Sequence, residues 1–153
     1  MNSEQASAFI DQHGLFWDRV GGNRTMGRIL AWLMICNPPE QSAPDIVAAL
    51  DVSKASVSTA MRGLETARLI ERVARPGSRR VHFRLPPGGW DVVARRRVEE
   101  AANLIAIAEK GVAAVADEPP GHQERIRDYL EWLTWWRRAQ EDLLRGRPKG
   151  ERK

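Results

Sequence analysis

The sequence has few of the residues from which enzyme and metal sites are built. Its 153 residues include one cysteine, Cys36, and three histidines that are scattered along the chain. They lack the spacing of a metal site, and the chain has neither a glycine-rich phosphate loop nor a serine nucleophile elbow. We therefore expect no catalytic residue, no bound metal and no cofactor.

A single cysteine also excludes an internal disulfide. Cys36 lies in an apolar run with helical spacing, where a thiol is usually buried and inert. A redox sensor is the alternative role for such a residue.

Long apolar runs are missing as well. No segment approaches the ~20 apolar residues that a membrane-spanning helix needs, and residues 1–10 lack the cationic flank and apolar stretch of a secretory leader. Hydrophobic residues still make up 42% of the chain, which is enough for a folded core. We predict a cytoplasmic protein that does not bind membranes.

Positive charge is concentrated in one part of the chain. The formal net charge of the whole chain is only +4. Residues 51–85 alone contain eight Lys or Arg against three acidic residues, a local charge of +5. Such an excess indicates a polyanionic partner, with a solvated basic face as the alternative.

The basic segment begins with a predicted helix. Val57, Met61 and Leu64 are spaced i, i+4, i+7, so one side of this helix packs inward. The opposite side carries small side chains and one long cation: Ala55, Ser58, Thr59 and Arg62. None of them is bulky enough to keep a helix out of a DNA major groove ~12 Å wide.

The start of this helix is suited to phosphate contacts. Ser53 can cap the first turn, because its hydroxyl accepts a hydrogen bond from a free backbone amide. The remaining free amides and the helix dipole attract anions. We predict that Lys54 and Ser56 lie beside DNA phosphates and fix the docking register.

A basic hairpin follows the helix. Residues 70–75 and 81–85 read as strands, and the second alternates Val81, Phe83 and Leu85 inward with His82 and Arg84 outward. Pro76, Gly77 and Ser78 supply the turn between them. Just past the tip, Arg79 and Arg80 are long cations that can reach an adjacent narrow groove.

Two further helices precede the basic segment. One spans about 25–36 and ends before Pro38, and a short one spans about 43–50, capped by Ser42 with Asp45 three residues on. Three helices, a short turn and a basic hairpin predict a winged helix-turn-helix. The expected fold class is mainly α with a small β wing, plus dimerisation helices from both termini.

Short motifs spread over residues 25–85 point to a known family. They are Gly27-Arg28-Ile29-Leu30, Asp45-Ile46-Val47, Ser56-Val57-Ser58, Leu69-Ile70-Glu71-Arg72 and Gly77-Ser78-Arg79-Arg80. Together they resemble the multiple-antibiotic-resistance regulator (MarR) family of winged-helix transcriptional regulators. Trp32, Cys36-Asn37-Pro38 and Phe83-Arg84-Leu85 are similar to the actinobacterial branch that includes repressors of efflux pumps.

The resemblance implies roles for particular residues. In that family the motif helix enters the major groove, a wing arginine enters the minor groove, and helices from both chain ends form a dimer. By resemblance, the groove role passes to Ser56, Ser58, Thr59 and Arg62, and the wing role to Arg80. The family wing usually has an acidic residue two positions before that arginine. Ser78 stands there, so the orienting ion pair is missing, and Arg79 could take over the contact.

A long helix with a heptad pattern is predicted after residues 86–89. Its inward positions are Ala94, Val98, Ala101, Ile105, Ala108, Val112 and Val115. The alanines allow another helix to approach closely. The cationic run 95–97 precedes Glu99 and Glu100, so we interpret it as a solvated, ion-paired face, with a DNA contact as the alternative.

The first and last helices carry many aromatic residues. After Pro119, Pro120 and Gly121, the last helix presents Ile126, Tyr129, Leu130, Leu133, Trp136, Leu143 and Leu144 on one face. The first helix presents Ala6, Phe9, Ile10, His13, Phe16, Trp17 and Val20, with His13 more typical of a packed residue than of a ligand. One helix should not expose so much aromatic surface, so we expect a second subunit to cover it. Folding of the last helix onto the first is the alternative.

These patterns predict four segments. Residues 1–21 are an N-terminal dimerisation helix and residues 22–88 a DNA-binding lobe. Residues 89–145 are C-terminal dimerisation helices. Residues 146–153 form a basic tail too polar to pack, which we expect to be disordered.

The functional prediction is a homodimeric regulator that binds double-stranded DNA sequence-specifically at a near-palindromic site, with half-sites ~10 bp apart. The resemblance implies a repressor of a transport or efflux operon that an apolar or amphiphilic effector relieves. Such an effector could lie among Phe16, Trp17, Trp90 and Trp132, although aromatic stripes are more often core. The alternative is a winged-helix protein-interaction module, or one that binds nucleic acid without reading sequence. Such a module would not need Thr59, Arg62 and the wing arginines on one face.

Overall fold

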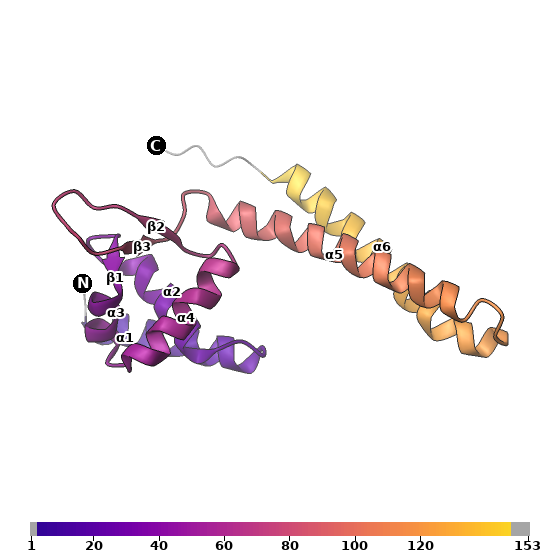
Figure 1. The fold of residues 1–153 in the computed structure, drawn as a ribbon, viewed down its shortest axis with the longest axis horizontal. Helices are drawn as coiled ribbons and strands as arrows, with labels where there is room; N and C mark the ends of the chain where they lie inside the picture. Colours follow the sequence, from indigo (N-terminus) through magenta and orange to yellow (C-terminus); the bar gives the residue numbers. More distant parts are fainter. Residues whose placement is uncertain (1–2, 148–153) are drawn as a thin grey trace. The chain divides into compact units, whose positions relative to one another are not determined.

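The structure is a computed structural model that describes residues 3–147. The chain divides into two compact units, and the boundary along the sequence falls between Gly89 and Trp90. The first contains α1 (Ser3–Arg19), α2 (Arg24–Ile35), β1 (Gln41–Ser42), α3 (Ala43–Leu50), α4 (Lys54–Thr66), β2 (Glu71–Val73) and β3 (His82–Arg84). The second contains most of α5 (Gly89–Ala114) and all of α6 (Pro120–Gly146), which run antiparallel as a hairpin (Figure 1).

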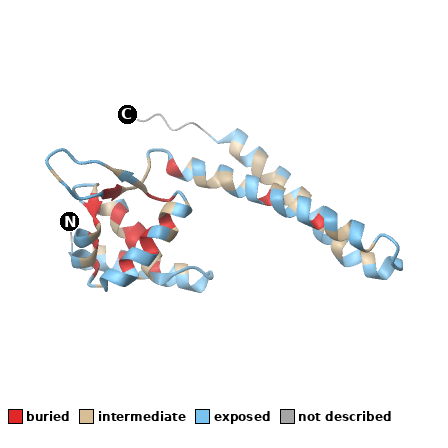
Figure 2. Cartoon of the chain, viewed as in Figure 1, coloured by how far each residue is buried: buried red, intermediate tan, exposed pale blue. Residues whose placement is uncertain are grey.

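The core of the first unit lies where α2, α3 and α4 meet (Figure 2). Its fully buried side chains come from the helical stripes: Ile29, Leu30, Ile46, Val57 and Leu64. The predicted inward stripe of α4 is therefore the one that packs. Among the residues described, no helix is long and apolar enough to cross a membrane.

Two glycines allow α1 and α2 to approach closely. A Cβ added to Gly27 would lie 2.8 Å from Trp17 Cβ and 3.0 Å from Gly14 Cα. The ring of His13 is hydrogen-bonded at this crossing, since its Nδ1 donates to the Gly27 carbonyl at 2.7 Å. His13 is thus a packed residue. Gly14 is buried at the same contact.

The wing is a three-stranded antiparallel sheet with the order β1-β3-β2. The sequence predicted two strands and missed β1, which is only two residues long. The inward and outward assignment of the second strand was also wrong at its start. His82 is buried with 4% of its surface exposed, whereas Val81 is 49% exposed. Strand β3 is the central strand, and His82 has Ser42 of β1 on one side and Val73 of β2 on the other.

In the second unit the heptad positions are the covered ones. Ala101 and Ala108 of α5 and Leu133 of α6 are buried, and the remaining predicted heptad residues are half-buried. Helix α6 continues through Arg145 and Gly146, the point at which we expected the chain to stop packing. Arg145 pairs there with Glu141 and Asp142. The rest of the predicted tail, 148–153, lies outside the described residues.

Candidate nucleic-acid interface

Helix α4 begins with a hydrogen-bonded serine pair. The Ser53 hydroxyl accepts from the Ser56 amide at 3.1 Å, which is the predicted N-cap, and the two hydroxyls lie 2.8 Å apart. The cap stabilises the first turn and leaves its other amides pointing outward. Lys54 follows directly and is exposed. The start of α4 therefore offers a cation and free amides to an anion.

The outer face of α4 is polar and carries small side chains with one long cation. Ser58, Thr59 and Arg62 are all exposed, and Ala55 lies on the same side. On the inner side Val57, Ala60, Met61 and Leu64 are buried. The structure thus brings the predicted groove residues together on one helical surface.

The two arginines at the tip of the wing are exposed to solvent. Gly77 has φ +79°, a backbone conformation that glycine adopts without strain, and it turns the chain at the tip. Arg79 and Arg80 follow, and both are exposed. The Ser78 hydroxyl accepts from the Arg80 amide at 3.1 Å, so Ser78 orders the backbone of the turn.

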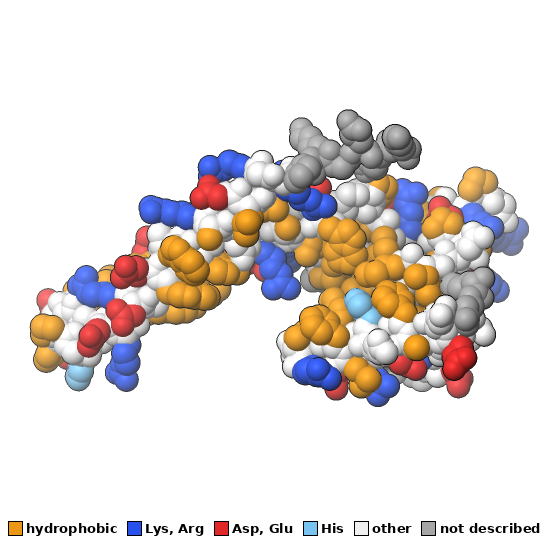
Figure 3. Space-filling view, turned by 180° about the vertical axis from the view of Figure 1, so that it is seen from behind, with side chains coloured by type: hydrophobic (Ala, Val, Ile, Leu, Met, Phe, Trp, Pro, Cys, Tyr) orange, Lys and Arg blue, Asp and Glu red, His pale blue; other side chains and the backbone are white. Residues whose placement is uncertain are grey.

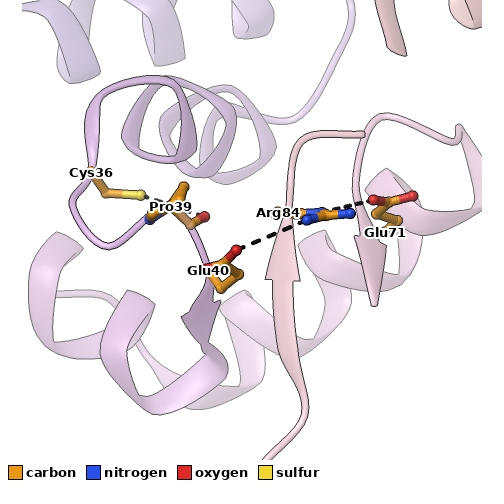
Figure 4. Close-up of polar contacts among 5 residues, drawn as sticks. All are labelled: Cys36, Pro39, Glu40, Glu71 and Arg84. Carbon is orange, nitrogen blue, oxygen red and sulfur yellow. Dashed lines mark hydrogen bonds and ion pairs between the residues drawn. The ribbon is translucent and has the colours of Figure 1, made fainter. Parts of the chain in front are cut away.

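Ion pairs divide the eight cations of the basic segment into two groups. Arg72 of β2 makes a bidentate pair with Glu65 at the end of α4, and Arg84 of β3 pairs with Glu71 at 2.8 Å and with Glu40 at 3.9 Å (Figure 4). These two arginines hold the wing together. Within residues 3–147, the other six have no carboxylate within ion-pairing distance: Lys54, Arg62, Arg68, Arg75, Arg79 and Arg80.

This division was missed from the sequence, where all eight cations counted equally. One pair carried a usable signal, because Glu71 and Arg84 stand opposite each other in the hairpin register, and opposite charges favour such positions. The Glu65–Arg72 pair joins a helix to a strand and has no comparable local signature. The free cations are Lys54 and Arg62 on α4, Arg68 in the turn after it, and Arg75, Arg79 and Arg80 in the wing.

Cys36 lies at the end of α2, apart from these cations. Its thiol is buried and its Sγ lies 4.0 Å from the Pro39 carbonyl (Figure 4). Burial raises the pKa of the Cys36 thiol, which keeps it protonated and unreactive at neutral pH. The inert role is the one that this environment favours.

Comparison with known proteins identifies the family. Residues 23–81 match a model described as MarR family, and residues 88–145 match one described as an MmpR5-like MarR family transcriptional regulator. The HTH-type transcriptional regulator MmpR5 of Mycobacterium tuberculosis is 34% identical over 136 residues, which cover 89% of this chain and 82% of that protein. The chain belongs to the MarR family. The crystal structure of a transcriptional regulator that is 33% identical in sequence matches this chain with a TM-score of 0.82. The match covers 92% of this chain and 95% of that regulator's chain.

Membership in the MarR family confirms two predictions made from the sequence. The first is the resemblance itself, including the actinobacterial branch. The second is the fold class, a mainly α protein with a small β wing. The matched proteins are described as transcriptional regulators rather than enzymes.

The four aromatic residues predicted to line an effector site fall in both units of this MarR protein. Phe16 and Trp17 belong to α1, and Trp17 packs against Gly27. Trp90 and Trp132 belong to α5 and α6 and are about half exposed, at 48% and 51%. A hollow of about 470 Å³ in the second unit is lined by none of the four and mostly by charged side chains, such as Asp91, Arg95 and Glu141.

Proposed function

We propose that this MarR-family protein is a repressor that binds double-stranded DNA sequence-specifically as a homodimer. The observation that carries the proposal is the division of cations: the six without a carboxylate partner include Lys54 and Arg62 on α4 and both arginines of the wing tip. Small polar side chains surround Arg62 on the outer face of α4. This combination suits a helix in the major groove with a wing arginine in the minor groove.

In this proposal each residue has one kind of contact. Lys54 and Ser56 bind phosphates at the start of α4, which positions the helix without reading sequence. Ser58, Thr59 and Arg62 contact base edges, where the forked guanidinium of Arg62 is suited to guanine. Arg79 and Arg80 reach the minor groove, whose width depends on the sequence.

Dimerisation follows from apolar surface that one chain leaves uncovered. Leu104 and Ile107 of α5 and Tyr129, Trp132 and Trp135 of α6 are each at least 41% exposed. Figure 3 shows apolar side chains gathered along this hairpin. A second copy covering them would present two α4 helices to the two halves of a near-palindromic site, ~10 bp apart.

The regulated operon and the effector are inferred from the family branch. The resemblance to actinobacterial efflux-pump repressors supports a transport or efflux operon as the target. We infer that an apolar or amphiphilic molecule that contacts Phe16, Trp17, Trp90 or Trp132 relieves repression. It would favour a dimer in which the spacing of the two DNA-binding lobes no longer fits the spacing of the half-sites. Titration of the protein–operator complex with fatty-acid-like or hydrophobic drug molecules tests this, and unchanged operator affinity would count against it.

The DNA-binding proposal is tested by footprinting on the source genome, followed by mobility-shift assays on the protected site. We expect Arg62→Ala to lose about 1–3 kcal/mol of binding free energy and to relax selectivity at one base pair. Lys54→Ala should weaken binding to every sequence and reduce the salt slope by about one.

The matched control is Arg125→Ala, which removes the same charge from an exposed position of α6 and should bind the operator as the wild type does. Equal losses on operator and random DNA for Arg62→Ala would refute base reading by that residue and favour a module that binds nucleic acid without sequence preference. Absence of any binding to duplexes from the source genome would favour a protein-interaction module.

A further inference from the structure

One arginine joins the edge strand of the wing to the end of α4. Arg72 of β2 donates through Nε and Nη2 to the two carboxylate oxygens of Glu65, and the bond from Nη2 is 3.0 Å long. Glu65 lies in the last turn of α4, and the short turn 67–70 connects this helix to β2. The pair therefore braces the corner between α4 and the wing. Its forked geometry fixes the direction of the contact as well as its length.

The same guanidinium also contacts the central strand of the wing. The Cζ of Arg72 lies 5.7 Å from the centre of the Phe83 ring, which is a cation–π contact. Arg72 and Phe83 stand directly opposite each other in the register of β2 and β3, so their side chains share one face of the sheet. Phe83 is itself buried. The side chain of Arg72 is thus held by groups from both α4 and β3.

The arginines of the wing tip lie beyond this brace. Arg79 and Arg80 belong to the segment 74–81, which connects β2 to β3. Strand β1 also holds the wing, but it pairs with β3 over two residues only. The position of the tip relative to α4 therefore depends on how firmly β2 is held to that helix. A segment that is ordered before it binds loses less conformational entropy on binding.

We propose that Glu65 and Arg72 are positioning residues that fix the wing relative to α4. The brace sets the distance between the outer face of α4 and the wing-tip arginines, so that both meet the DNA together. Arg72 acts through its geometry, because one edge of its guanidinium is occupied by Glu65 and its centre lies over Phe83. This inference rests on the proposed DNA-binding function, in which α4 enters the major groove and the wing tip enters the minor groove.

Glu65→Gln separates positioning from electrostatics. The change is nearly isosteric and removes an acid beside the DNA-binding surface, which by itself strengthens binding to a polyanion. The amide nitrogen of glutamine cannot accept the second hydrogen bond from Arg72, so the forked pair is lost. If the pair positions the wing, operator affinity instead falls, by about two- to fivefold for one exposed ion pair. Mobility shift with the full-length protein at fixed salt measures the affinity.

Glu71→Gln is the matched control. It makes the same change on β2, and side chain 71 faces the other side of the sheet from Arg72, because neighbouring residues of a strand alternate. Its partner Arg84 keeps a second carboxylate, that of Glu40 at 3.9 Å (Figure 4). The brace between α4 and the wing is intact in this variant, so operator affinity should stay the same or rise slightly.

Further variants separate positioning from a general weakening of α4. In a protein that lacks both wing-tip arginines (Arg79→Ala and Arg80→Ala), Glu65→Gln should cause no loss, because no tip contact remains to be positioned. In a Lys54→Ala background the loss should persist, since Lys54 lies at the other end of α4. Arg72→Lys, which keeps the charge but lacks the fork, should also weaken operator binding.

The opposite results overturn the proposal. They are unchanged or stronger binding by Glu65→Gln, an equal loss by Glu71→Gln, wild-type affinity of Arg72→Lys, or a loss by Glu65→Gln that is the same with and without the wing-tip arginines. If removing the wing-tip arginines weakens binding and Glu65→Gln does not, only this inference fails and the proposed function stands. If removing them leaves operator affinity at the wild-type level, the wing contact of the proposed function fails, and the inference fails with it.

Discussion

At the scale of single residues, the tightest constraint lies where α1 crosses α2. Gly27 is buried there, and the atoms nearest to an added Cβ are Cβ and Cγ of Trp17, which are close to the main chain. They cannot move aside without moving α1. The hydrogen bond from His13 to the Gly27 carbonyl depends on the same close approach.

Gly27→Ala should therefore destabilise the protein. Overpacking costs about 1–3 kcal/mol, which exceeds the gain in helix propensity of up to about 1 kcal/mol. Urea unfolding followed by circular dichroism measures the difference. Gly121→Ala is the matched control, because nothing lies within 4 Å of its added Cβ, and its stability should equal or exceed that of the wild type. Equal stability of the Gly27→Ala protein would show that the crossing can relax.

At the scale of elements, short helices depend on their caps. Helix α3 has only eight residues, and its capping box joins Ser42 and Asp45 in both directions. Helix α4 uses a simpler cap, Ser53 alone. Because the capping box includes a carboxylate, the stability of α3 depends on pH in a way that the stability of the α4 cap does not.

Hydrogen bonds from the Ser42 hydroxyl and amide lower the pKa of Asp45, and this determines the sign of the dependence. The folded state favours the carboxylate, so the stabilisation is complete above the ordinary carboxyl pKa and is lost as the pH falls through the lower folded value. We expect the wild type to be more stable than Asp45→Asn at about pH 7, and the difference to shrink toward about pH 3. Urea midpoints across this range measure it. A difference that stays constant or grows in acid contradicts the prediction.

At the scale of the whole molecule, the second unit leaves much of its apolar surface exposed. Among the described residues from 90 to 147, only Ala101, Ala108 and Leu133 are buried. Trp132 and Trp136 stack with their ring centroids 6.0 Å apart, yet Trp132 remains 51% exposed. Large aromatic surfaces of this kind mark protein interfaces.

Trp132→Glu should convert the proposed dimer to a monomer, because a charge would be placed in the apolar surface that the second copy is proposed to cover. Sedimentation equilibrium should then give half the mass of the wild-type dimer. Operator affinity should fall by a factor of about 10²–10⁴, because the two DNA-binding lobes are no longer linked. Arg138→Gln changes the charge equally at an exposed position on another side of α6, and it should remain dimeric. A dimeric Trp132→Glu protein would exclude this face as the interface.

Much of this protein can be read from local patterns in its sequence. The caps at Ser42 and Ser53, the inward stripe of α4 and the heptad of α5 each depend on residues within a turn or two, so spacing alone predicts them. The exposed side of α4, with Ser58, Thr59 and Arg62, follows from the same periodicity. Their role in binding DNA stays a prediction.

Contacts between distant residues required the folded chain. Strand β1 is formed by its pairing with β3, and in the folded chain the consecutive residues His82 and Phe83 are both buried, which a two-residue alternation does not predict. Arg72 and Arg84 leave the set of free cations because their partners Glu65, Glu71 and Glu40 come from other elements. Periodicity carries no information on such pairs, because hydrogen bonds and ion pairs across elements depend on distances that only packing creates.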